Sequence, residues 1–334
     1  MSEKINTREL RKLQDKGIMR GFERIQDAQA PFTANNIGMP AGLLSQVSVD
    51  VVRNILAKRS GDEILGGRKK VIDWEKQDYY VPFVEQTGQT TPYGDFNQPK
   101  VSGANVNFAR TGHYVFSAKY QYGDREASQY AQSGINYIDY CLASATEAIA
   151  VEYNRSLVSG FMEASGSFLV YGLLNNPHLP AYLNSSSTFA QRTWDGIMSF
   201  FAGALQALVT QSGNNINALS RLRCAVSASA FAQLQAKFTT QGFSVVDLLR
   251  KTYPNMEFVP AIELDAANAN QNVLYLIGDS EVGGGVETSI AGYSELARMG
   301  NVVYGDYSFS QSISAGSLGA LFYKPSFVIR FSGV

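Results

Sequence analysis

The sequence predicts an α+β protein with an N-terminal extension and two core regions. A proline-free helical pattern runs from about Asp124 to about Ala164, and apolar residues alternate with polar ones between Tyr79 and Tyr122. Helix and strand patterns then alternate from Trp194 to Ile277, which is typical of a compact mixed unit. A chain of 334 residues is long enough for two core regions with extensions.

Composition narrows the function classes. The 28 basic and 29 acidic residues give a formal net charge of -1, which argues against a protein that binds polyanions through its overall charge. Only 17% of residues are charged and 45% are hydrophobic, as suits a subunit that buries much of its surface against neighbours.

Cysteine usage and hydropathy indicate a soluble product of a reducing compartment. Cys141 and Cys224 lie within apolar patterns, so we expect buried free thiols and no disulfide framework or paired metal ligands. The start, residues 1–10, is polar and lacks the apolar core of a signal peptide. The longest nearly apolar run, residues 197–209, is too short to cross a bilayer. We therefore expect a cytoplasmic product with no membrane partner.

The N-terminal part reads as an extension. Residues 1–27 mix both charges closely, which indicates a solvated helix or arm. Residues 30–42 contain Pro31, Gly38, Pro40 and Gly42, a linker composition. Apolar spacing resumes only from Leu43 onward.

Strand patterns follow. We expect strands at 80–85, at 105–110 and at 114–122, with a Gly-, Thr- and Pro-rich loop at 87–100. Pro82 confines the first strand to an edge or a bulge. So few strands with a long polar loop bury little by themselves.

The long helical pattern ends in an apolar turn. At about 1.5 Å per residue, a continuous helix from Asp124 to Ala164 would be about 60 Å long. The turn Tyr171–Pro177 contains Asn175-Asn176-Pro177, which favours a turn because of the proline ring and the side-chain bonds of asparagine. Leu173 and Leu174 are expected to be buried there.

A compact unit is expected after this turn. The patterns predict helices at 194–210, 229–239 and 245–251, and strands at 222–226, 256–259, 273–277 and 327–331.

The order of these predicted elements, together with four local matches, resembles that of the major capsid proteins of tailed bacteriophages. The matches are Tyr93-Gly94-Asp95, Gly123-Asp124-Arg125-Glu126, Asn154 and the turn Gly172 to Pro177. The resemblance covers Ile72 to the C-terminus. It implies the Hong Kong 97-type capsid fold, which encapsulin nanocompartments share. The implied divisions are an arm (1–71), an extended β loop (72–122), a peripheral domain with a spine helix (123–185), an axial domain (186–299) and strands returning to the peripheral domain (300–334).

The resemblance also implies a function. A subunit of this kind self-assembles into pentamers and hexamers of the icosahedral head that encloses double-stranded DNA. Scaffolding, portal and decoration proteins are possible partners, and contact with packaged DNA would be weak and nonspecific. The protein would be made in the host cytoplasm and reside in the virion. An encapsulin-type shell remains an alternative.

An α/β hydrolase-like enzyme is the alternative from another class. The segment from Gly278 to Val282 begins like a nucleophile elbow at Ser280, but it lacks the second glycine at position 282. His178 or His113 would have to act as the base. Histidines without an assigned partner are more often structural.

Other chemical sites are weaker still. Gly283-Gly284-Gly285 matches no phosphate-binding motif and is expected to be a loop tip. The aromatic strand from Tyr114 to Tyr122 is more often a packing face than a nucleic-acid platform. We therefore expect no catalytic, cofactor-binding or metal-binding residues and no cofactor. Four carboxylates are expected to form a solvated rim, namely Asp265, Asp279, Glu281 and Glu287.

Overall fold

The computed structural model describes residues 59–91, 93, 95, 98, 100–132, 136–279 and 287–334. The chain divides into two compact units, Met1–Lys58 with Tyr122–Tyr140, and Arg59–Gln121 with Cys141–Val334. The described part of the first unit holds α3 (Asp124–Gln132), which buries no residue. Its Tyr130 ring stacks on Tyr137 at 4.6 Å between centroids.

Several expectations lie outside the described residues. They are the arm and linker in residues 1–58, the glycine of the Tyr93-Gly94-Asp95 match, and the loop of residues 280–286 with Ser280, Glu281 and the three glycines.

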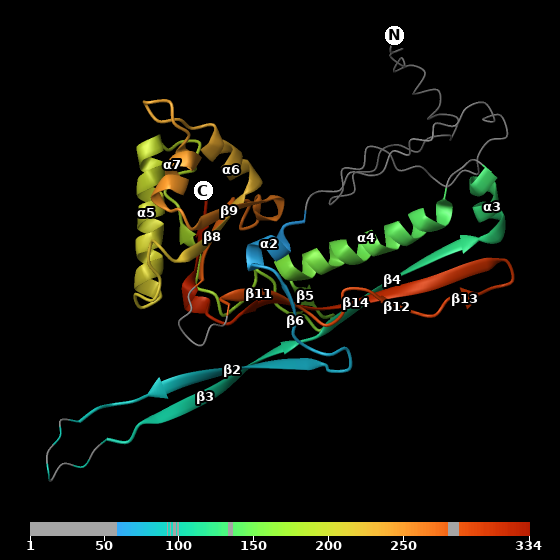
Figure 1. The fold of residues 1–334 in the computed structure, drawn as a ribbon, viewed down its shortest axis with the longest axis horizontal. Coiled ribbons are helices and arrows are strands. Elements are labelled where there is room, and N and C mark those ends of the chain that lie inside the picture. The colour runs from blue at the N-terminus through green and yellow to red at the C-terminus, as the bar shows by residue number, and fades with distance from the viewer. Residues whose placement is uncertain are drawn as a thin grey trace. The chain divides into compact units, whose positions relative to one another are not determined.

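The second unit contains a five-stranded sheet covered by helices (Figure 1). Its order is β7 (Leu183–Asn184), β15 (Val328–Ser332), β10 (Val273–Asp279), β8 (Arg221–Ser227) and β9 (Met256–Ala261). Strand β10 is antiparallel to both neighbours, whereas β8 and β9 are parallel. One core joins this sheet to α5 (Trp194–Gln211), α6 (Ala228–Gln235) and α7 (Val245–Thr252). The expected helices and strands of the compact unit are present, but the helix expected at 229–239 ends at Gln235, and Phe238 instead forms a β-bridge with Ser244.

A six-stranded sheet forms around one long strand, β14 (Ser308–Phe322). Its partners are β11 (Ser289–Tyr293), β12 (Arg298–Met299), β13 (Val303–Tyr304) and β4 (Tyr114–Gly123), and β1 (Arg68–Lys70) pairs with β11. Ala145 and Ile149 of α4 (Tyr137–Val158) pack against Ile313 and Ala315 of β14. This sheet therefore depends on a strand that the sequence patterns did not predict.

The long helix is shorter than expected. Asn136 lies outside both helices, and α4 ends at Val158, so the prediction of one continuous helix to Ala164 is wrong. Gly160 has φ +70, and a Cβ there would lie 2.4 Å from the carbonyl oxygen of Val170. The chain then forms the small hairpin of β5 (Phe161–Met162) and β6 (Phe168–Val170). The helix stops because glycine turns the backbone against this hairpin.

The extended loop is a two-stranded ribbon (Figure 1). Strands β2 (Asp78–Thr87) and β3 (Gly103–Gly112) pair in register along all ten residues of each strand. At its root, Arg110 Nε lies 2.9 Å from Asp78 Oδ1, and the hydroxyls of Tyr79 and Tyr323 are 3.5 Å apart. The strands expected at 80–85, 105–110 and 114–122 are confirmed, and Pro82 lies on an edge as predicted.

The returning strands separate. Strand β14 lies against α4, but β15, which follows a 3-10 turn (Pro325–Phe327), pairs with β10 in the five-stranded sheet. Strands in 300–334 were expected to return to the peripheral domain; β14 packs against the long helix, whereas β15 belongs to a different sheet. Phe331 and Ile329 pack into the α5 core while Val328 packs into the core on the other face. Apolar residues on both faces suit a strand buried between two layers. Likewise, β11 and β12 belong to the six-stranded sheet rather than to the axial unit expected at 186–299.

Candidate assembly surfaces

The ribbon carries an exposed apolar face, here called the ribbon face. Val84 pairs with Val106 and Pro82 with Phe108, so these side chains lie on one side of the two strands. Tyr80, Val84, Val106 and Phe108 are between 50% and 65% exposed. Large apolar side chains gathered on an open surface mark an interaction site.

A second exposed patch lies around β12 and β13. This tip patch consists of Met299, Val303, Tyr304 and Tyr307, which are between 59% and 84% exposed. The Tyr304 ring meets Phe309 edge-on at 5.3 Å. The ribbon face and the tip patch are therefore two groups of exposed aromatic and aliphatic side chains, as is typical of surfaces that bind another protein.

The turn after α4 closes the end of that helix. The backbone N–H groups of Leu173 and Leu174 donate to the carbonyls of Leu157 and Val158 at 2.8 and 3.0 Å. These bonds satisfy acceptors that a helix end leaves unpaired. Leu173 is buried as expected, and Leu174 is half-buried.

Two residues of the turn shape it. Asn175 accepts from the N–H of Gly172 at 2.7 Å and donates to the carbonyl of Ser159 at 2.8 Å. Gly172 is required by close approach, because a Cβ there would lie 2.4 Å from the carbonyl oxygen of Val158. The turn is therefore bonded to the helix end on both sides.

A buried arginine joins three elements. Arg223 of β8 is 2% exposed, and its Nε and Nη2 lie 3.0 and 2.9 Å from the two carboxylate oxygens of Asp279 on β10. Its Nη1 donates to the carbonyl of Ile64 in α2 (Gly61–Leu65) at 3.0 Å. Gly66 has φ +90, and a Cβ there would lie 2.2 Å from Nη1. The guanidinium therefore leaves room only for glycine after α2.

A second polar cluster surrounds Glu263 in the 3-10 turn Ile262–Leu264 and is here called the Glu263 anchor. Ser60 donates its N–H to Oε1 at 3.1 Å and its hydroxyl to Oε2 at 2.5 Å. Asn154 Nδ2 donates to Oε1 at 2.8 Å, and Asn154 Oδ1 accepts from the N–H of Gly61 at 3.0 Å. The neighbouring Arg59 forms an ion pair with Glu147.

These bonds hold the Glu263 carboxylate in its charged form. Burial alone would raise the pKa of Glu263, but hydrogen bonds from Ser60, its own backbone and Asn154 outweigh that effect and lower the pKa below its ordinary value. Asn154, one of the positions that carried the family resemblance, thus has a structural role.

The two histidines that the hydrolase alternative would use as a base, His113 and His178, lie in different surroundings. His113 Nδ1 lies 2.9 Å from the carbonyl of Lys76, which can only accept, so Nε2 accepts from the Ser294 hydroxyl at 2.7 Å. Ser294 is fully buried whereas His113 is half-buried, so a substrate cannot reach the Ser294 hydroxyl. His178 is exposed, and its backbone N–H donates to Asn176 Oδ1.

Two of the four carboxylates expected in a solvated rim have partners within the chain. Asp279 is paired with Arg223, and Asp265 accepts from the N–H and the hydroxyl of Ser229 at 3.2 and 2.8 Å. Glu287 is exposed. Within the described ranges, no group of three metal-ligating side chains is close enough to hold a metal ion.

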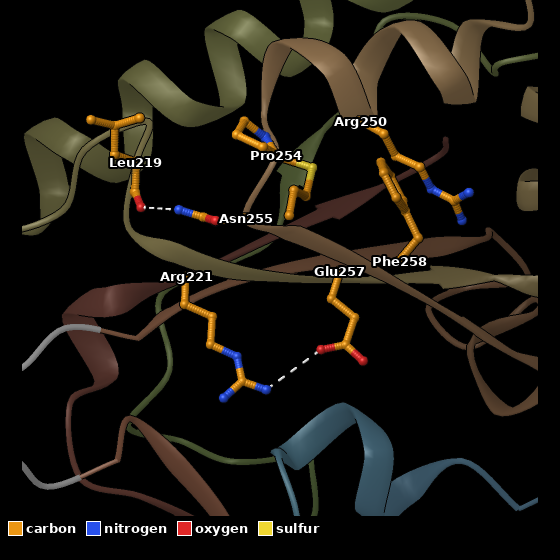
Figure 2. Close-up of a pocket in the computed structure, with 8 residues that line it drawn as sticks. Leu219, Arg221, Arg250, Pro254, Asn255, Glu257 and Phe258 are labelled. Atoms are coloured by element: carbon orange, nitrogen blue, oxygen red, sulfur yellow. Dashed lines mark hydrogen bonds and ion pairs between the residues drawn. The ribbon is translucent and has the colours of Figure 1, made fainter.

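A groove of about 790 Å³ lies along the edge strand β9 (Figure 2). Arg221 and Glu257 lie across from each other there at 3.6 Å, and Asn255 donates to the carbonyl of Leu219. Arg250 and Phe258 complete one side. The lining has no serine, cysteine or histidine, and its Arg221 and Glu257 are paired with each other.

The two cysteines differ in burial. Cys224 is buried, and burial raises the pKa of its thiol, whereas Cys141 is only half-buried, contrary to expectation. None of the described helices is both long enough and apolar enough to span a membrane.

The architecture is that of phage capsid subunits. Against the capsid of Myoviridae phage XM1 the TM-score is 0.73 at 11% identity, covering 90% of this chain and 100% of that one. The capsid protein of a native GTA particle gives 0.58 at 9% identity (87% and 95% covered), and that of Gordonia phage Cozz gives 0.56 at 12% (87% and 91% covered). These likenesses establish the shared Hong Kong 97-type fold.

The sequence identifies the family. Residues 30–333 match the family model of the Pa193 gp26 major capsid protein, so the chain belongs to this family. It is a structural subunit of a phage capsid shell and a component of the virion. No curated protein sequence matches it.

Proposed function

We propose that the chain assembles into pentamers and hexamers of an icosahedral head that encloses double-stranded DNA. The observation that supports this most is the ribbon face, because a two-stranded ribbon with four half-exposed apolar residues gains little from folding alone. In the shell it would lie over the adjacent subunit and become buried. Standard interfaces bury about 1,200 to 2,000 Å² in total, and the exposed apolar side chains of the ribbon would contribute to such a contact.

The elements take family roles in this proposal. Residues 1–58 of the expected arm (1–71) serve as the arm, because α2 and β1 are bonded into the folded body. Strands β2 and β3 of the expected loop (72–122) serve as the extended loop, and α4 with the six-stranded sheet, which includes β4, forms the peripheral part. The five-stranded sheet with α5, α6 and α7 forms the axial part around the pentamer and hexamer centres. Scaffolding, portal and decoration proteins would join this shell, and packaged DNA would make weak nonspecific contacts.

The protein is proposed to act by association and to catalyse no reaction, after synthesis in the host cytoplasm. The His113–Ser294 pair supports this, because the Ser294 hydroxyl is buried and closed to substrates. An encapsulin-type shell is less supported: a virus-like particle from Pyrococcus furiosus gives a TM-score of 0.51 at 14% identity, covering 82% of this chain and 97% of that one, which is a likeness of fold alone.

Electron microscopy of the purified full chain tests the proposal directly. We expect closed shells with fivefold and sixfold capsomers. A homogeneous monomer under all assembly conditions, including added scaffolding protein, would contradict it.

A pair of neighbouring substitutions tests the ribbon face. Phe108→Ser removes an exposed apolar side chain, so the melting temperature of the free subunit should stay nearly unchanged while shell formation falls sharply. Asn107→Ser, on the opposite face of β3, serves as the control and should assemble normally. Equal assembly by both variants would argue against this face as a contact.

A further inference from the structure

The second compact unit begins at Arg59, and the chain is bonded tightly at that residue and the next two. Arg59 pairs with Glu147, and Ser60 and Gly61 donate three hydrogen bonds to Glu263 and Asn154. The first residues of a folded body are usually poorly ordered unless they are tied down. Here 58 further residues precede them.

The hydrogen bonds from Ser60 to the Glu263 carboxylate are strong because they are buried and their acceptor is charged. Ser60 is 1% exposed, so its N–H and hydroxyl have no access to water, and both reach one carboxylate. Hydrogen bonds to a charged acceptor are stronger than neutral ones. Gly61 fits because a Cβ there would lie 2.7 Å from Asn154 Oδ1. Glu263 therefore holds Ser60 directly and holds Gly61 through Asn154.

A separate set of contacts holds the chain just beyond the anchor. The carbonyls of Ile64 and Leu65 accept from Arg223 and from the Ser289 hydroxyl at 3.0 and 3.1 Å, and both side chains are buried. Strand β1 then pairs with β11. Loss of the Glu263 bonds would thus loosen Ser60 and the Asn154 amide that holds Gly61, and would leave the solvent-exposed Arg59–Glu147 ion pair to hold the residue before them. The body from Asp62 onward would stay attached.

We propose that Glu263 is a positioning residue for assembly, which fixes the point and direction at which the N-terminal extension leaves the folded body. This rests on the proposed function. Two loosened residues span about 7 Å when extended, so the exit point would move by a comparable distance. An extension that reaches neighbours from a variable exit point cannot set one repeating subunit geometry. Shell size should then become heterogeneous.

Full-length Glu263→Ala and Glu263→Gln test this, with Glu257→Ala as the matched control. Glu257 lies nearby on β9, where its exposed carboxylate pairs with Arg221. Hydrogen exchange at Ser60 and Gly61 in the free subunit should become about tenfold faster or more in Glu263→Ala. Exchange in β8 and β10 should stay unchanged. Glu263→Gln keeps one acceptor oxygen and should show a smaller effect.

Particle diameters measured by electron microscopy decide the outcome. We expect wild type and Glu257→Ala to give one narrow size class and Glu263→Ala to give a broad size distribution. Glu263→Gln should give a distribution of intermediate width. A narrow wild-type distribution in Glu263→Ala, despite faster exchange at Ser60, would overturn the inference. If Glu263→Ala does not fold, Glu263→Gln alone must broaden the distribution, and a wild-type result there also overturns it. Absence of shells from wild type and Glu257→Ala would instead refute the proposed function.

Discussion

At the scale of single residues, buried charges hold the body together. Arg330 of β15 is satisfied by the carbonyls of Leu174, Leu179 and Pro180, and its guanidinium lies 4.2 Å from the centre of the Tyr182 ring. Arg223 instead pairs with Asp279. Buried arginines are rare, and each needs a full set of partners. Removing a partner of a buried arginine should therefore cost more free energy of unfolding than removing a surface charge.

Removing Asp279 should show this difference. Asp279→Ala leaves the Arg223 guanidinium buried without its counter-charge, and we expect a loss of about 3 to 5 kcal/mol in the free energy of unfolding. Glu257→Ala breaks an exposed pair and should cost no more than about 1 kcal/mol. Urea unfolding of free subunits measures both. Similar losses would mean that burial does not set the cost.

The Glu263 carboxyl should make stability depend on acidity. Its pKa is lowered in the folded protein, so the ionised form stabilises the fold above the ordinary carboxyl pKa of 4.5 and this contribution is lost as the pH falls below it. Wild type should therefore lose its advantage over Glu263→Gln between about pH 5 and about pH 3. Thermal unfolding at several pH values checks this. A constant gap would contradict it.

At the scale of elements, periodicity predicted most of the fold. Helix α5 and strands β8, β10 and β15 were predictable because their apolar residues repeat at 3.6 or 2 positions. Strand β14 was missed because Ser308–Phe322 is rich in serine and glycine, whose burial depends on neighbours far away in the sequence. The helix was predicted too long for the same reason, because its end depends on a contact between distant residues. Gly160 has a positive φ and lies against the backbone of Val170, which the local sequence does not reveal.

The turn after α4 should be sensitive to charge. Replacing Leu173 and Leu174 with Asp should lower the free energy of unfolding by a few kcal/mol, because Leu173 is 1% exposed. Leu173→Asp alone should carry most of the loss, since Leu174 is only half-buried. Differential scanning calorimetry of the three variants checks both points. Soluble double mutants with unchanged melting would refute this placement.

At the scale of the whole molecule, the sequence could suggest the class of protein but not the contacts that hold it. The Glu263 anchor joins residues 203 positions apart, and Arg223 reaches Ile64 across 159 positions. No local pattern marks such pairs. The apolar residues of the ribbon face were visible as strand residues, but their exposure depends on what the rest of the fold leaves uncovered.

Loss of the residues most suited to catalysis should leave assembly intact. Alanine at His113, His178 and Ser280 together should still give shells, apart from a local stability cost where His113 bonds to Lys76 and Ser294. Esterase, phosphatase and nuclease assays on wild type and on this variant provide the measurement. Turnover that copurifies with wild type and disappears in the variant would favour the enzyme.

The pairing of β1 with β11 bears on how the chain folds during synthesis. Arg68 aligns with Ala291, so 291 − 68 = 223 positions separate the two ends of this contact. Contacts between distant positions form slowly, and a growing chain cannot make this one until residue 291 has left the ribosome. The six-stranded sheet is therefore completed late. Nascent chains that are still being translated from one messenger RNA would therefore lack the completed sheet and the subunit surface that depends on it. Shell growth would then wait until whole subunits are released.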